Sequence, residues 1–158
     1  MRSDSDILHK YITFSLGEED YGLPVLQALE IVKLENLITL PHSEDYFMGI
    51  MDIRGAVIPV INLRKKLGIH QDDSAESLDR VIIIRGGNRR IGLGVERVSH
   101  VHQFLPDSID SGPTTMKSSS SRFITGVGKI REQFIILLNL ENLFTPEELK
   151  GLARTAGV

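Results

Sequence analysis

Short segments in which apolar and polar residues alternate recur along most of this 158-residue chain. Because side chains point to the two faces of a β-strand in turn, such alternation is typical of half-buried strands. About ten of these segments follow one another at intervals of roughly 8–12 residues, separated by turn-forming residues and with little long helix between them. The pattern predicts an all-β fold, either a sandwich or barrels. The strand candidates are 11–16, 21–23, 48–53, 56–61, 80–85, 91–95, 98–104, 123–130 and 134–138.

The strand pattern is interrupted at the polar residues 70–78, which we interpret as a linker within a single domain spanning 1–158. The strands on either side are expected to close two sub-barrels, at approximately 11–62 and 80–139. The two halves show no convincing sequence repeat. Residues 1–9 are polar, which predicts a flexible N-terminus.

Two prolines mark local departures from the strand pattern. Pro24 suits the first position of a helix, and the apolar residues 25–32 that follow it predict a short helix with Glu30 as its only acid. Pro59 has no N–H to donate to a ladder, so the strand that contains it is expected at a sheet edge or with a bulge.

The last third of the chain contains one long connection and one helical segment. Residues 105–121 include Pro, Gly and a serine run, which predicts a long mobile loop. Residues 140–156 are expected to be helical. Within them Thr145 is a suitable N-cap, and Glu148 stands three residues further on, as in a capping box.

Composition narrows the possible classes of function. Hydrophobic residues make up 41% and charged residues 25% of the chain, which are values of an ordinary globular protein. The net charge is -3 and tryptophan is absent, whereas a nucleic-acid platform usually carries a basic excess and stacking rings. No apolar run is long enough to span a bilayer or resembles a signal peptide, and no cysteine is present. These features predict a soluble cytoplasmic protein without disulfides and without direct membrane insertion.

Motifs that carry catalysis or bind cofactors are missing from the sequence. There is no nucleophile elbow and no Walker lysine, and the Gly-x-Gly pairs at 92–94 and 126–128 lack the third glycine of a dinucleotide fingerprint. His100 and His102 share one face of a strand, but further ligands at useful spacing are absent, so a solvated strand face is expected rather than a metal site. We therefore expect no enzymatic activity, no cofactor and no metal.

The most distinctive segment is 48–64, where two strongly apolar strands meet at Arg54 and Gly55. Gly55 frees the backbone for a tight turn, and Arg54 would then present its guanidinium fork from a rigid loop, suited to pairing with a carboxylate. An incidental surface arginine is the alternative. Glu30, the lone acid of its apolar segment, is the expected partner of Arg54, and a solvated glutamate is the alternative there.

The same segment resembles the CheW family, whose pattern is approximately Asn-Leu-Arg-Gly-x-x-Ile-Pro-Val-x-Asp-Leu-Arg. The likeness extends from residue 10 to about 149 and includes Phe-x-Leu-Gly-x-Glu-x-Tyr-Gly-Leu at 14–23, Glu-Ile at 30–31 and Ile-Gly-Leu-Gly-Val at 91–95. The chain departs from the family at Ala28 for Val, at Asp52-Ile53 for Asn-Leu and at Glu96 for Asp.

The resemblance implies two intertwined five-stranded barrels similar to SH3 barrels, with short peripheral helices and no activity. It implies a chemotaxis scaffold, at receptor arrays, that binds the regulatory domain of a CheA-type histidine kinase and the cytoplasmic tip of methyl-accepting chemoreceptors. Kinase contacts would use barrel edges that we cannot assign to residues. The residues that the resemblance implies for receptor binding are Ala28, Glu30, Gly49, Arg54, Val98 and Val101.

Three alternatives remain open from the sequence. One is an adaptor of a related chemosensory pathway, such as pilus motility. A second is the amino-terminal domain of a CheV-like protein, which the absence of a receiver domain disfavours. The third, from another class, is a nucleic-acid-binding β-barrel protein, which the charge and the missing stacking rings disfavour.

Overall fold

The structure is a computed structural model that describes residues 9–41, 44–69, 78–110, 123–140 and 143–155. The predicted flexible N-terminus, apart from His9, and the predicted linker, apart from Leu78, lie outside the described residues. Most of the loop predicted at 105–121 also lies outside them. Its described part contains a short 3-10 helix, η3 (Pro106–Ser108), and a two-residue strand, β9 (Ile109–Asp110), so this part is not an irregular loop.

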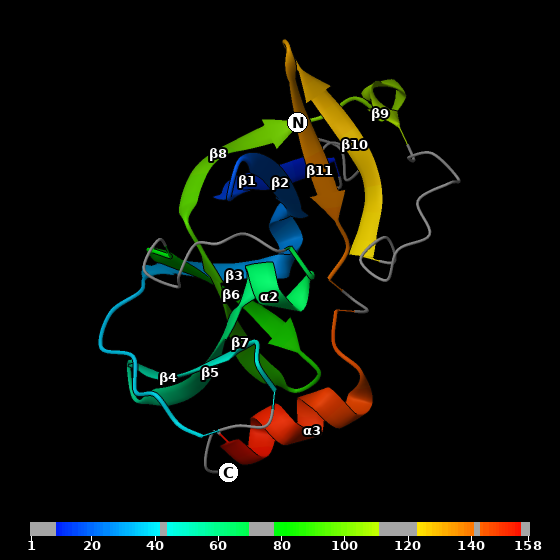
Figure 1. Cartoon of the computed structure of the whole chain (residues 1–158). Coiled ribbons are helices and arrows are strands. Elements are labelled where there is room, and N and C mark those ends of the chain that lie inside the picture. Colours follow the sequence, from blue (N-terminus) through cyan, green and yellow to red (C-terminus); the bar gives the residue numbers. More distant parts are fainter. Residues whose placement is uncertain (1–8, 42–43, 70–77, 111–122, 141–142, 156–158) are drawn as a thin grey trace.

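The described strands form two mixed sheets, one in the upper and one in the lower half of Figure 1. The six-stranded sheet has the order β8-β1-β2-β11-β10-β9, and the five-stranded sheet has the order β3-β6-β7-β5-β4. Besides β9, the six-stranded sheet contains β1 (Lys10–Leu16), β2 (Glu19–Pro24), β8 (Arg97–Gln103), β10 (Ile124–Ile130) and β11 (Gln133–Leu138). The five-stranded sheet contains β3 (Ala28–Lys33), β4 (Phe47–Ile53), β5 (Ala56–Asn62), β6 (Arg80–Gly86) and β7 (Arg89–Val95).

The predicted all-β, intertwined architecture is confirmed, but the predicted division into sub-barrels at 11–62 and 80–139 is wrong. The N-terminal hairpin β1–β2 belongs to the sheet of the C-terminal strands, where β1 pairs antiparallel with β8 and β2 pairs parallel with β11. The chain crosses to the other sheet after β2 and returns between β7 and β8. Alternation within a segment shows where a strand lies but not which strand it pairs with. The pairing of the N-terminal hairpin with the C-terminal strands therefore could not be predicted from the local sequence.

The helix predicted at 25–32 is also wrong. A 3-10 helix, η1, covers only Val25–Gln27, and the chain continues as strand β3. An isolated helix of eight residues is marginal, whereas β3 completes the edge of a sheet by pairing with β6 from Ala28 to Lys33. The register shifts between Ala28 and Glu30, which is a bulge near the start of β3.

Pro59 lies in an interior strand, because β5 is placed between β7 and β4. Of the two predicted alternatives, an edge strand or a bulge, the edge strand is therefore wrong. β5 pairs with β7 only from Val60 to Asn62, so Pro59 precedes the paired residues. The β4–β5 register shifts between Phe47 and Gly49, which places an irregularity in the partner strand close to the proline.

Both faces of β6, an interior strand of the five-stranded sheet, are buried. Ile82 and Ile84 pack into the largest core cluster, which also contains Phe14 and Leu16 from the six-stranded sheet. Val81 and Ile83 face the other way, into a smaller cluster enclosed by the five-stranded sheet, with members from β4 and β5. Each buried aliphatic side chain contributes roughly 1.5–3 kcal/mol of transfer free energy. Burial of the large central cluster is therefore the main contribution that holds the two sheets together.

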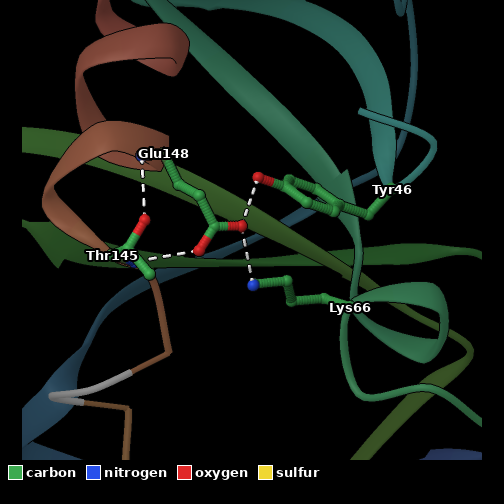
Figure 2. A network of polar contacts seen from close by, with 4 residues as sticks. All are labelled: Tyr46, Lys66, Thr145 and Glu148. Carbon is green, nitrogen blue, oxygen red and sulfur yellow. Dashed lines mark hydrogen bonds and ion pairs between the residues drawn. The ribbon is translucent and has the colours of Figure 1, made fainter. Parts of the chain in front are cut away.

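The C-terminal helix α3 (Pro146–Thr155) lies against the lower sheet in Figure 1 and is held by Glu148. The Thr145 amide donates to Glu148 Oε1 at 2.9 Å, and the Glu148 amide donates to Thr145 Oγ1 at 3.1 Å, which confirms the predicted capping box. In Figure 2 the other carboxylate oxygen faces Tyr46 and Lys66, the last residue of the one-turn helix α2 (Leu63–Lys66). Residues 140 and 143–145 are not helical, so the helix begins later than predicted.

Candidate interaction surface

The hairpin that joins β4 to β5 has a two-residue turn formed by Arg54 and Gly55. Both residues have positive φ, 52° for Arg54 and 88° for Gly55, as in the turns whose twist matches a β-hairpin. The Gly55 amide donates to Asp52 Oδ1 at 2.8 Å and fixes the turn. An arginine in a left-handed conformation is thus held at the tip of a rigid hairpin, with its side chain 71% exposed.

Arg54 forms an ion pair with Glu30, as predicted from the sequence. Arg54 Nη2 lies 2.5 Å from Glu30 Oε2. Glu30 is on β3 and Arg54 adjoins β4, and these strands are the two opposite edges of the five-stranded sheet. The contact therefore shows that the sheet curls until its edges meet. Because Arg54 is largely exposed, the pair adds only about 0–1 kcal/mol to stability, and its main effect is to orient the guanidinium.

The same closure explains the position of Gly49. Ile38, in the segment after β3, exchanges two backbone hydrogen bonds of 2.9 Å with Ile50 on β4. A Cβ atom at Gly49 would lie 2.2 Å from the Ile38 carbonyl oxygen, so only glycine fits under this crossing. Gly49 is buried beneath the segment, and we interpret its contribution as support for the closed barrel.

Val98 and Val101 are placed on β8, an edge strand of the six-stranded sheet. Val98 is half-buried and packs against the central core cluster, whereas Val101 is 53% exposed. The register with β1 shifts between Ile12 and Phe14, opposite Val101 and Val98. This irregularity turns the two valines differently, and both are at least partly exposed.

Ala28 is the remaining predicted receptor-binding residue. It is half-buried at the start of β3 and packs against the same central cluster as Val98. The predicted receptor-binding residues therefore come from both sheets, with Glu30 and Arg54 in direct contact on one and the two valines on the other.

Sequence reasoning missed a group of exposed apolar side chains beside Glu30. Leu29, Ile31 and Ile38 are all exposed, and Leu26 and Leu29 line a hollow of about 360 Å³ next to Ala28. Leu26, Leu29 and Ile31 were missed because residues 25–32 were predicted to form a helix, in which apolar residues would face a core. Exposed apolar patches mark interaction sites. We define the docking surface as Ala28, Leu29, Glu30, Ile31, Ile38, Arg54, Val98 and Val101.

The remaining candidate chemistry is polar and dispersed. The rings of His100 and His102 lie 6.0 Å apart and line a groove with Asp20 and Arg131. Within the described ranges, no group of three or more His, Cys, Asp or Glu side chains is arranged to hold a metal ion. Nor does any helix in that part of the chain have the length and apolar character needed to cross a membrane.

The chain is similar to known proteins of one family. The model of the CheW-like domain matches residues 10–148. The chain is 29% identical over 140 residues to the chemotaxis protein CheW of Klebsiella aerogenes, covering 89% of this chain and 84% of that protein. CheW of Treponema pallidum is 28% identical over 152 residues, with 94% and 89% covered.

A solved structure shows the same arrangement of strands. The scaffolding protein TtCheW from Thermoanaerobacter tengcongensis superimposes with a TM-score of 0.76 at 30% identity, covering 92% of this chain and 93% of that one. The family match, the relatives and this structure all extend over most of the chain. The chain therefore belongs to the CheW-like family and is a non-catalytic chemotaxis scaffold protein.

Proposed function

We propose that this protein couples chemoreceptors to a CheA-type histidine kinase, and that the docking surface is where the receptor binds. The observation that carries the proposal is the Glu30–Arg54 pair, which orients an exposed guanidinium, and the two neighbours of Glu30 in β3, Leu29 and Ile31, are exposed apolar residues. Apolar contact area next to one directed polar group is the combination by which a groove recognises an amphipathic helix.

The receptor element that fits this surface is the helical hairpin at the cytoplasmic tip of a methyl-accepting chemoreceptor. One stripe of apolar side chains on the helix would cover Leu29, Ile31 and Val101. Arg54 would donate to a carboxylate or to backbone carbonyls of the same helix, since a guanidinium presents several donors in a fixed fork. Both sheets contribute to the contact, so receptor binding depends on the relative position of the two sheets.

The kinase partner is the regulatory domain of a CheA-type histidine kinase, bound away from the docking surface so that both partners are held at once. We infer that the protein works in the cytoplasm at receptor arrays and reaches the membrane only through the receptor. This inference follows from membership in the family.

Titration of a purified receptor hairpin-tip fragment into the protein tests the proposal. The wild-type protein should bind, and Arg54→Ala should bind more weakly while its melting temperature stays close to wild type, because a surface arginine changes stability by only about 0.5 kcal/mol. Arg80→Ala is the matched control, since Arg80 is a half-exposed arginine of the same sheet paired with Asp79. Equal affinity of all three proteins, or no binding by the wild type, would refute the proposal.

A further inference from the structure

We infer that Arg64 and Glu96 form a clamp that fixes the angle between the two sheets and so positions β8 against β3 in the docking surface. The inference rests on the proposed function, because it concerns how the two halves of that surface are aligned. Arg64 and Glu96 form an ion pair in which the arginine side chain is only 3% exposed and the glutamate 18%.

Glu96 lies at the joint between the sheets. It is the single residue between β7, which belongs to the five-stranded sheet, and β8, which belongs to the six-stranded one. Its backbone amide donates to the Ser15 carbonyl on β1 at 3.2 Å, so its main chain is attached to the six-stranded sheet. Its carboxylate bonds Arg64, which follows β5 of the other sheet. One residue thus joins both sheets, one by its backbone and one by its side chain.

Arg64 is held rigidly at its end of the contact. It lies in α2, where the Asn62 side chain caps the helix by accepting from the Lys65 amide at 3.2 Å. The Arg64 carbonyl accepts from the Ile69 amide at 2.9 Å, which closes the end of the same turn. The main chain of Arg64 is fixed in this way and its side chain is buried, so its guanidinium is a suitable anchor for a carboxylate between two strands.

The burial of this pair argues for orientation rather than stability. Removing two charges from water costs so much free energy that well-packed apolar residues often serve stability equally well or better. What the ion pair adds is a defined geometry, because a guanidinium and a carboxylate attract each other in few arrangements. Apolar side chains at this place would also hold the sheets together, but they would fix the angle between the sheets less strictly than the ion pair does.

The position of the clamp links it to the docking surface. β8 begins at Arg97, directly after Glu96, and Val98 and Val101 follow within five residues. A small rotation at Glu96 would therefore shift both valines relative to Glu30 and Arg54 on the other sheet. A receptor helix that needs both sheets at once would then find its binding-competent arrangement in only a fraction of the molecules.

The test replaces the clamp and measures geometry and binding separately. The chain has no cysteine, so Lys33→Cys on β3 and Gln103→Cys at the far end of β8 allow spin labels to report the distance between the sheets. The main variant is the double substitution Arg64→Met with Glu96→Met, which keeps the site filled with apolar groups. Asp79→Asn, in an exposed ion pair of the five-stranded sheet, is the control.

We expect the double variant to fold, to show a broader distance distribution than the wild type and to bind the receptor hairpin fragment about tenfold more weakly, as when about a tenth of the molecules are competent. The control should match the wild type in both measurements. If the double variant does not fold, Glu96→Gln, which keeps the size of the side chain and removes its charge, should show the same two changes to a smaller degree.

The outcomes separate this inference from the proposed function. Failure of the wild type to bind would refute the proposed function, whereas the distance measurement would still decide whether the clamp sets the angle. An unchanged distance distribution in the clamp variants would overturn the inference even if the wild type binds. A broadened distribution with unchanged affinity would overturn the link between the clamp and docking.

Discussion

Lys66 and Glu148 lie 82 residues apart in sequence and form an ion pair of 2.8 Å between Lys66 Nζ and Glu148 Oε2. The lysine ammonium also lies 5.0–5.8 Å from the centres of three aromatic rings, those of Tyr46, Phe123 and Phe144. The same Glu148 oxygen accepts from the Tyr46 hydroxyl at 2.7 Å. As Figure 2 shows, the Glu148 carboxylate on α3 thus contacts Tyr46, which precedes β4, Lys66 in α2, and Thr145 at the start of its own helix.

This arrangement predicts that stability falls in acid through Glu148. Burial alone would raise its pKa, but the hydrogen bonds from Lys66, Thr145 and Tyr46 outweigh burial and lower the pKa from 4.5 to about 2. A carboxyl group whose folded pKa is lowered stabilises the fold above its unfolded pKa and loses that contribution as the pH falls towards the folded value. Between pH 4.5 and 2 we expect a loss on the order of 3 kcal/mol in the free energy of unfolding.

Glu148→Gln separates this contribution from the other carboxylates. At pH 7 the variant should be destabilised by about 3 kcal/mol or more, because Lys66 keeps a buried charge without its counter-charge. Denaturant unfolding at pH 7, 4 and 2.5 should then show a much smaller further loss for the variant than for the wild type. The same pH dependence in both proteins would mean that Glu148 does not control acid stability.

A double-mutant cycle on Glu30 and Arg54 should give a small coupling energy in the free energy of unfolding. We expect about 0–1 kcal/mol, decreasing at high salt, because the arginine is largely exposed and the attraction is screened. Urea unfolding of the wild type, Glu30→Ala, Arg54→Ala and the double variant measures it. A coupling well above this range would mean that the pair holds the sheet closed and does not merely orient Arg54.

Val101→Glu should abolish receptor binding at little cost in stability. Val101 is 53% exposed, so a carboxylate there stays in water but interrupts the apolar contact. The matched control is Ile12→Glu, because Ile12 is the direct partner of Val101 on β1 and is only 7% exposed. That change buries an unpaired charge and should cost several kcal/mol. A melting temperature of Val101→Glu as low as that of the control would show that Val101 belongs to the core.

Gly49→Ala should destabilise the fold by more than about 2 kcal/mol, because the new methyl group would lie 2.2 Å from the Ile38 carbonyl oxygen. Gly151→Ala in α3 is the control, since its new Cβ would meet nothing within 4 Å and alanine favours a helix. Thermal melts of the two variants decide the point. If Gly49→Ala melts like the wild type, the glycine is not required for barrel closure, and its effect on binding would have to be direct.

Most of the local structure could be predicted from the sequence, because it depends on local chemistry. The turn at Arg54-Gly55, the capping box at Thr145 and most strands follow from turn preferences, side-chain oxygens and alternation, and the structure confirms them. The proximity of Glu30 and Arg54 was also predicted, on the grounds that each was the lone charge in an apolar setting.

The errors have a common physical origin in long-range pairing. Residues 28–33 become a strand only because β6 offers them an edge, and the hairpin β1–β2 joins the C-terminal strands rather than its neighbours in sequence. The exposure of Leu29 and Ile31 was missed for the same reason, because it depends on β3 being an edge strand. The pairing of Arg64 with Glu96 left no sequence signal, because 32 residues separate them.

The parallel pairing of β2 with β11 has a consequence for biosynthesis. Ribosomes deliver β1 and β2 first, yet their ladder partners on both sides, β8 and β11, are translated only after residues 97 and 133. The hairpin must therefore wait with unpaired edges while the five-stranded sheet, whose strands are contiguous between residues 28 and 95, assembles during translation. Such delayed, sequence-distant pairing slows folding and favours aggregation of the nascent chain, and the open edges of the N-terminal hairpin are exposed to this risk until β8 and β11 are made.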